Sequence, residues 1–303
     1  MFRDWISAFR PRTLFLAVAS VILGSGLAWH VGKFETAVFV LALLLAVLLQ
    51  TLANLANDLG DYQHGTDVTG HREGPERAVQ SGRISEKQMK TAVVAVIVLS
   101  ALTGVSLLAV AAKNISRTYL FALLLFGVLS ILAALFYTLG KKPYGYYGLG
   151  DFAAFFFFGP VPVAGVYLLH VHLIDFQPIL PAVGLGLVST MILNVNNMRD
   201  IENDIASGKN TFASRIGLTK AKVYHALMQI ILTACFLGYS FMFAIEPWYR
   251  FVYVIVFVFQ FNILIKILKS PGGRSLDPYL KLTSISGLLL AVFFSLCICA
   301  GCE

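Results

Sequence analysis

The chain alternates between long apolar segments and short polar ones. Nine intervals contain no Asp, Glu, Lys or Arg, and eight of them hold 20 to 23 residues. Because a helix needs about 20 apolar residues to cross a bilayer, each of these intervals predicts a membrane-spanning helix. They are 13–32, 36–57, 91–112, 118–140, 152–174, 176–198, 223–245, 251–265 and 282–302. None has the alternation of a membrane β-strand, so the predicted fold is an all-α polytopic bundle of nine transmembrane helices.

Composition agrees with this prediction. Of the 303 residues, 58% are hydrophobic and 13% are charged, whereas a soluble protein carries about 25% charged residues. The short eighth interval is flanked by Trp248 and Tyr249, which can anchor it at the interface. Arg250 and Lys266 can extend from its ends toward water. We therefore expect a single membrane domain over residues 1–303, with the lipid bilayer as its main partner.

The basic residues indicate how the bundle is oriented. If the N-terminus is placed in the cytoplasm, 19 of the 23 Lys and Arg residues fall in cytoplasmic segments and 4 on the other side. Such a bias is typical of a protein in a bacterial cytoplasmic (inner) membrane. The net charge of +7 is then mostly this bias, and it does not indicate a nucleic-acid partner.

A first acidic cluster lies where the second apolar interval ends. Asn54, Asn57, Asp58 and Asp61 are spaced three and four residues apart, which places them on one face of a helix. Asp67 follows six residues later. Carboxylate and carboxamide oxygens are the ligands that a hard divalent cation prefers. Alone, the pattern is also typical of a solvated helix end, and it remains a weak motif.

A second acidic cluster repeats the first. Asn197, Asp200 and Asp204 lie 143 residues after Asn54, Asn57 and Asp61, and they also follow an apolar interval. Solvated helix ends have no reason to repeat at a fixed offset, so we expect two sites that face one cavity. The offset predicts two repeated halves, about 13–140 and 152–268, with an extra helix at 282–302. Facing carboxylate clusters are typical of metal ions that bridge a diphosphate.

Basic and aromatic residues on the same side supply candidate binding groups. Arginine suits phosphate geometry, lysine can neutralise a diphosphate or a carboxylate, and tyrosine faces can stabilise a cation. Asp151 opens the fifth predicted helix, where it serves either catalysis or the helix dipole. The arginines before the first helix either anchor it at the surface or meet an anion. The predicted substrate-binding residues are Asn54, Asn57, Asn197, Arg10, Arg12, Arg77, Lys141, Lys142, Lys209, Tyr137 and Tyr144.

Taken together, these motifs resemble the UbiA superfamily of intramembrane prenyltransferases. The resemblance covers the whole chain and rests on four segments: Arg10–Leu14, Asn54–Asp67, Tyr137–Asp151 and Asn196–Lys209. Within the superfamily, the spacing from Asp61 to Asp67 matches the branch that prenylates 1,4-dihydroxy-2-naphthoate. That branch usually has Glu where this chain has Asp151, which shortens the reach of the carboxylate.

The resemblance implies a central cavity, open to the cytoplasmic side, and a mechanism. Mg²⁺ held by Asp58, Asp61, Asp67, Asp200 and Asp204 binds the diphosphate of a polyprenyl donor. An aromatic acid attacks the allylic carbon, and loss of carbon dioxide gives demethylmenaquinone. The implied catalytic residues are Asp58, Asp61, Asp151, Asp200 and Asp204.

Two alternatives remain open at this level. One is a prenyltransferase for another aromatic acceptor, such as 4-hydroxybenzoate. The other is a membrane transporter, which would have charges in mid-span and interrupted helices. The predicted spans carry no such charges, and the acids gather on one side.

Overall fold

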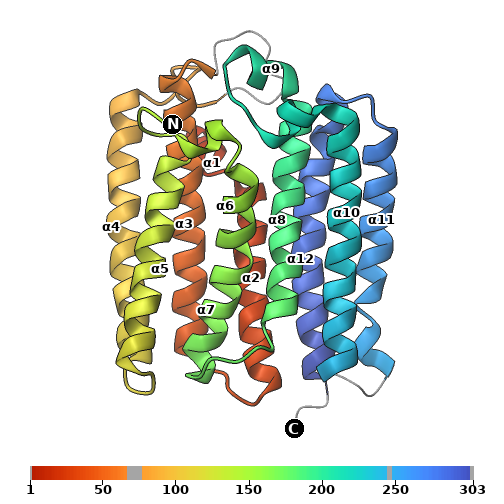
Figure 1. The fold of residues 1–303 in the computed structure, drawn as a ribbon. Helices are drawn as coiled ribbons and strands as arrows, with labels where there is room; N and C mark the ends of the chain where they lie inside the picture. Colours follow the sequence, from red (N-terminus) through yellow and green to blue (C-terminus); the bar gives the residue numbers. More distant parts are fainter. Residues whose placement is uncertain (1, 67–76, 244–247, 301–303) are drawn as a thin grey trace.

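The computed structural model describes residues 2–66, 77–243 and 248–300. Within them, nine helical segments are long and apolar enough to span a membrane, which confirms the predicted all-α, multi-pass fold. They stand side by side in one bundle (Figure 1). The spans contain α2 (Pro11–His30), α3 (Thr36–Gln63), α4 (Glu86–Ala111), α5 (Arg117–Phe136), α6 (Gly150–Phe158) with α7 (Pro160–Val171), α8 (Ile179–Arg199), α10 (Phe212–Phe243), α11 (Val254–Lys269) and α12 (Asp277–Cys299).

Short elements gather at one end of the bundle. The amphipathic α1 (Phe2–Phe9) and α9 (Ile201–Ala206) lie there, at the end where α3 and α8 finish (Figure 1). The 3₁₀ helix η2 (Tyr144–Tyr147) follows α5 in the connection to α6. We call this end the acidic end, because Asp61 and Asp200 lie there. Helix α12 ends at Cys299, at the opposite end of the bundle (Figure 1).

The main hydrophobic core joins the first span to the last ones. Leu23 of α2, Leu185 of α8, Phe236 of α10 and Phe294 of α12 are fully buried in one cluster. In contrast, α5 has no buried residue. An apolar helix without a buried face contacts lipid on one side and lines an internal space on the other, so α5 forms a thin wall.

The fifth span is interrupted, although the sequence predicts one helix over 152–174. Pro160 has no backbone N–H and starts a new helix after Gly159. A Cβ on Gly159 would lie 2.4 Å from the carbonyl oxygen of Ala182 and 2.6 Å from the backbone nitrogen of Gly186. The junction between α6 and α7 therefore packs directly on the backbone of α8.

The two acidic clusters have different backbones. Helix α3 runs to Gln63, six residues past the end of its apolar interval, so the whole segment from Asn54 to Asp61 is helical. Helix α8 ends at Arg199, and Asp200 has φ −101° and ψ 16° before α9 starts. The second cluster is thus split by a break at Asp200.

Candidate active site

A cavity of about 1240 Å³ runs from the acidic end into the apolar part of the bundle. Its wall includes residues of α2 to α8 and α12. The polar part of the wall includes Asn54, Asn57, Asp58, Asp61, Arg77, Asn196, Arg199 and Lys209. The apolar part includes Leu45, Leu108, Leu124, Ile131, Phe157, Phe158 and Val161. Such a space can hold a molecule with a charged head and a long hydrocarbon tail.

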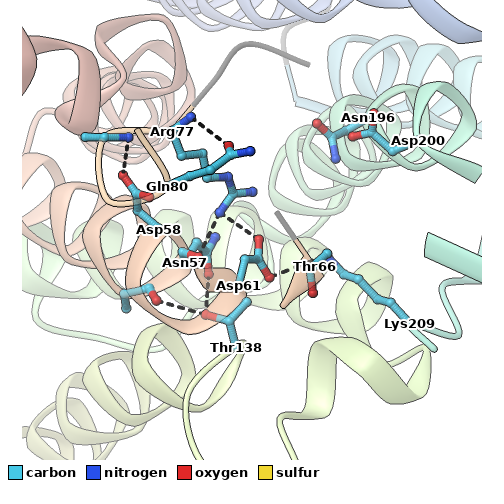
Figure 2. Close-up of polar contacts among 12 residues, drawn as sticks. Asn57, Asp58, Asp61, Thr66, Arg77, Gln80, Thr138, Asn196, Asp200 and Lys209 are labelled. Atoms are coloured by element: carbon cyan, nitrogen blue, oxygen red, sulfur yellow. Dashed lines mark hydrogen bonds and ion pairs between the residues drawn. The ribbon is translucent and has the colours of Figure 1, made fainter. Parts of the chain in front are cut away.

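Asp61 is the best compensated acid of the site. Its side chain is 2% exposed, and the Nη1 atom of Arg77 lies 2.6 Å from Oδ2. The hydroxyl of Tyr146 donates to Oδ1 at 2.8 Å, and the Nζ atom of Lys209 lies 4.0 Å from the same oxygen. Figure 2 shows Arg77 over Asp61, with Asn196 and Asp200 across from them. Buried cations thus surround this carboxylate.

Asp58 is buried with less compensation. Its Oδ2 accepts a hydrogen bond from the backbone N–H of Ala78 at 3.3 Å. Its Oδ1 is buried and has no hydrogen-bond partner among the described residues. Leaving a buried carboxylate oxygen unpaired is unfavourable. This oxygen therefore fits a bound cation.

In the second cluster, Asp200 is held by its neighbour in sequence. Arg199 donates from Nε to Oδ1 of Asp200 at 2.9 Å and from Nη2 to Oδ2 at 2.6 Å. The same Nη2 donates to Oδ1 of Asn196 at 2.9 Å. Its Nη1 donates to Asp277 of α12 at 2.7 Å. Arg199 therefore ties the end of α8 to the start of α12.

Within the described part of the chain, Asp204 has no arginine partner of this kind. Its Oδ2 accepts from the hydroxyl of Thr211 at 3.2 Å. Burial raises the pKa of Asp204 to about 7. Lys209 and Thr211 hold the pKa down, while Asp200 and Asp61 raise it further. A buried carboxylate surrounded by other carboxylates is short of positive charge, so Asp204 also fits a cation.

Lys209 joins the two clusters. Its Nζ lies near Asp61 and 5.2 Å from the ring centroid of Tyr146. Burial lowers the pKa of Lys209, but Asp61 and Asp204 raise it by more, so the pKa is raised overall. The ammonium group of Lys209 therefore interacts electrostatically with acids from both halves of the chain.

No preformed metal cage exists in the described residues, because no three His, Cys, Asp or Glu side chains there converge on one point. Protein cations are paired with Asp61 and Asp200 instead. Mg²⁺ usually takes only one or two protein carboxylates and completes its shell with substrate phosphates and water. The unpaired oxygen of Asp58 and the raised pKa of Asp204 are consistent with this mode of binding. Asp67 lies outside the described residues.

Several of the predicted binding residues lie in the cavity wall. Tyr137, Tyr144, Arg10 and Arg12 all line it.

Arg10 has φ 49°, an unusual backbone for a non-glycine residue. Burial and the charge of Arg77 lower the pKa of Arg10 to about 9, while Asp58 and Asp61 oppose this. The strained corner between α1 and α2 thus turns a cation toward the first cluster. Asn54 fastens that corner, because its amide donates to Phe9 and Thr13 at 2.8 Å each.

Other predicted residues are not brought to the cavity. Lys141 and Lys142 are exposed and do not belong to its wall. Asn197 is buried behind the wall, and Asp200 and Asp204 do not belong to the wall either. Asp151 also lies outside the wall; its side chain is hydrogen-bonded to Tyr224 of α10. The face of α6 that carries Asp151 is therefore turned toward α10.

Three residues near the site were not predicted as site residues. Thr138 donates to Oδ1 of Asn57 at 3.1 Å. Tyr146 contacts Asp61, Lys209 and Thr66. Asp277 lines the cavity, although its segment has the composition of a simple turn. For Thr138 and Tyr146, their place in the Tyr-rich connection was a usable signal.

Comparisons with known proteins place these features in context. The model of the UbiA prenyltransferase family matches residues 17–300. A 1,4-dihydroxy-2-naphthoate octaprenyltransferase of Haemophilus influenzae is 42% identical, over 98% of this chain and 96% of its own length. The protein of the same name from Escherichia coli is 46% identical over 74% and 72%, and that of Mycobacterium tuberculosis is 35% identical over 96% and 95%.

Solved structures show the same fold. A UbiA homologue from Archaeoglobus fulgidus superposes with a TM-score of 0.68 at 13% identity, over 97% of this chain and 99% of the other. The same homologue bound to DMAPP and Mg²⁺ gives a TM-score of 0.64 at 13% identity, over 96% and 99%. Its complex with GPP and Mg²⁺ gives 0.64 at 15%, with the same coverage.

Proposed function

The chain belongs to the UbiA prenyltransferase family, and we infer that it is a 1,4-dihydroxy-2-naphthoate octaprenyltransferase of menaquinone synthesis. It transfers the prenyl group of a polyprenyl diphosphate to the naphthoate ring, which loses carbon dioxide to give demethylmenaquinone. The full-length relatives carry this activity in their names. The observation that carries the proposal in the structure is one cavity whose wall combines Asp58 and Asp61 of the first cluster, Arg199 and Lys209 beside the second cluster, and a long apolar space.

Mg²⁺ is the proposed cofactor. Asp58, Asp61, Asp200 and Asp204 would hold it, with Asp67 as a further predicted ligand. When bound, the metal neutralises the diphosphate leaving group. The Mg²⁺ complexes of the Archaeoglobus fulgidus homologue with DMAPP and GPP support this proposal.

The remaining polar residues of the wall orient the substrates. Arg77 and Lys209 lie beside Asp61, so they reach the diphosphate oxygens at the same place. Arg10 and Arg12 also line the cavity, directly after α1, and they bind the acceptor carboxylate in this proposal. The exposed Lys141 and Lys142 can only attract the acceptor from solution.

Apolar and aromatic residues protect the reacting carbon. As the allylic carbon–oxygen bond weakens, its carbon gains positive charge, which the faces of Tyr137 and Tyr144 stabilise. The hydrocarbon wall excludes water, which would otherwise capture the cation. The acidic acceptor is then the nucleophile nearest to the charged carbon.

We place the protein in the cytoplasmic membrane of a bacterium, with the acidic end toward the cytoplasm. The distribution of 19 of 23 basic residues on that side supports this orientation. The bacterial relatives support the choice of membrane. A cysteine replacing Ser85 should be protected from a membrane-impermeant maleimide in intact cells, while one replacing Asn114 reacts. Equal labelling would contradict the orientation.

The test of function is an isotope experiment. Membranes containing the protein receive 1,4-dihydroxy-2-naphthoate labelled in its carboxyl carbon, octaprenyl diphosphate and Mg²⁺. We expect labelled carbon dioxide and an unlabelled prenylated product, formed faster than any product from 4-hydroxybenzoate. A prenylated product that keeps the label, or a preference for 4-hydroxybenzoate, would contradict the proposal.

A further inference from the structure

An acid outside both clusters lies at the cavity, where α8 meets α12. Among the described residues, the acids in the cavity wall are Asp58, Asp61 and Asp277. Asp277 is the first residue of α12, the helix that stands outside the predicted repeat. The position 143 residues before it is Ala134. Asp277 is therefore an addition to the site that the repeated pattern does not contain.

Arg199 connects this acid to the second cluster. One edge of its guanidinium, Nε with Nη2, grips both carboxylate oxygens of Asp200. The remaining nitrogen, Nη1, donates to Oδ1 of Asp277 at 2.7 Å. The Arg199 side chain is only 4% exposed, whereas the side chains of Asp200 and Asp277 are 12% and 40% exposed, so the guanidinium is buried and Asp277 is its partner on the solvent side. A planar fork of this kind fixes the direction of each partner.

The charges of this triad favour a cation at Asp200. Two carboxylates share one guanidinium, so Asp200, Arg199 and Asp277 together carry one negative charge. Without Asp277, the full charge of Arg199 would be directed at Asp200 and the group would be neutral. A divalent cation that approaches Asp200 competes with Arg199, and Asp277 offers the guanidinium a second partner during that competition.

We propose that Asp277 is a positioning residue for the second acidic cluster. By holding the far edge of Arg199, it keeps Asp200 in place and preserves the net negative charge that draws a metal–diphosphate ligand. The ninth span thereby serves the site as well as the core. This proposal rests on the proposed function, because that function supplies the metal–diphosphate ligand.

The test compares purified wild type with Asp277→Asn and Asp277→Glu. Binding of Mn²⁺ is measured by the electron paramagnetic resonance signal of the free ion, with geranyl thiolodiphosphate as an unreactive donor analogue. Asp277→Asn should weaken Mn²⁺ binding roughly tenfold, as expected for losing one unit of charge a few ångströms away. Asp277→Glu keeps the charge and should restore binding to within about threefold. In assays, Asp277→Asn should raise the Mg²⁺ requirement while kcat at saturating Mg²⁺ stays close to wild type.

Glu86→Gln provides a matched control. Glu86 also pairs with a cation at 2.7 Å, and its side chain is 42% exposed against 40% for Asp277. It lies on α4, away from the cavity wall, so Mn²⁺ binding should not change. Arg199→Lys is the second variant. It keeps the charge but cannot span both acids, and it should weaken Mn²⁺ binding in the same way.

The outcomes are distinguishable. Unchanged Mn²⁺ affinity in Asp277→Asn would overturn the proposal, as would equal weakening in Asp277→Glu, since that would show a need for shape and not charge. Thermal unfolding without metal reports whether each variant is folded; if Asp277→Asn does not fold, the Arg199→Lys result decides. A failure of wild type to prenylate the naphthoate would contradict the proposed function but would leave the Mn²⁺ comparison intact.

Discussion

Asp61 and Asp204 occupy equivalent positions of the 143-residue repeat, yet their surroundings differ. Asp61 lies on an unbroken helix and is paired with Arg77, Tyr146 and Lys209. Asp204 follows the break at Asp200, and its pKa is raised by burial to about 7. The repeat therefore conserves the kind of ligand and not the charge balance around it. Asp61 is neutralised by protein cations, whereas Asp204 is short of positive charge, which a bound cation can supply.

The strongest test of this comparison removes one acid from each cluster. Asp61→Asn and Asp204→Asn should each lower kcat about 100-fold or more, because each removes a carboxylate from the group that stabilises the leaving diphosphate. Initial rates with octaprenyl diphosphate at limiting Mg²⁺ measure this. Asp175→Asn, which alters the acid bonded to Tyr167 of α7, is the control. If only one of the two site variants is impaired, the clusters do not act together.

Lys209 lies between the clusters, so its removal should affect both. Lys209→Gln should raise the KM for the donor about tenfold, since a charge-assisted contact to diphosphate is lost. Arg215→Gln is a control from the same region: Arg215 is exposed and donates to the carbonyl oxygen of Tyr147. Steady-state kinetics with varied donor would separate the two. Similar KM values for both variants would show that Lys209 does not contribute to donor binding.

The same substitution should have opposite effects on stability in the two clusters. Without metal at pH 8, Asp61→Asn should lower the melting temperature by several degrees, because the half-buried Arg77 loses its carboxylate partner. Asp204→Asn should raise it, because an unfavourable buried charge is removed. Thermal unfolding in detergent with EDTA measures both. A shift of the same sign in both variants would contradict the proposed difference in charge balance.

The pH dependence gives this contrast a second readout. The pKa of Asp204 is about 7 in the folded protein, against 3.8 for an ordinary Asp side chain. Between these two pH values, the folded protein therefore retains a proton that the unfolded chain has released. The stability of the metal-free protein should therefore fall as pH rises from about 4 to about 7 and then level off. The Asp204→Asn variant should lose this part of the dependence. An unchanged profile in that variant would assign the titration to another group.

The smallest expected effect concerns Tyr146, which contacts Asp61 of the first cluster and Lys209. Tyr146→Phe keeps the ring beneath Lys209 but loses the hydrogen bond to Asp61. One hydrogen bond to a charged group contributes about 1.5–3 kcal/mol, but Arg77 still holds Asp61. We therefore expect only a two- to fivefold rise in donor KM, and a larger rise for Tyr146→Ala, which also loses the ring. Equal effects of the two variants would remove any role for the ring.

The nine spans were predictable because each depends on a local property, a run of apolar residues without charge. The spacing of Asn54, Asn57, Asp58 and Asp61 was likewise sufficient to place them on one helix face. The break at Gly159 depends on the close approach of its backbone to α8, and such a contact cannot be predicted from hydropathy. The break was nevertheless signalled by the Gly-Pro pair.

Charge pairing could not be predicted in the same way. Arg77 and Lys209 were expected near diphosphate, but their contacts with Asp61 join segments that are 16 and 148 residues apart. The orientation of Asp151 toward Tyr224 depends on the rotation of α6, which an almost uniformly apolar helix does not reveal. Asp277 stands in a Gly- and Pro-containing turn, and only the packing of α12 on α8 brings it to Arg199.

The central claim is that the two clusters bind one metal–diphosphate ligand between them. It is tested most directly by a structure of the protein with Mn²⁺ and an unreactive polyprenyl diphosphate analogue, in which anomalous scattering locates each ion. The account predicts ions within about 2.3 Å of carboxylate oxygens from both α3 and the α8–α9 segment, with the diphosphate between them. Ions bound to carboxylates of one cluster alone, with no ion at the carboxylates of the other cluster, would contradict it.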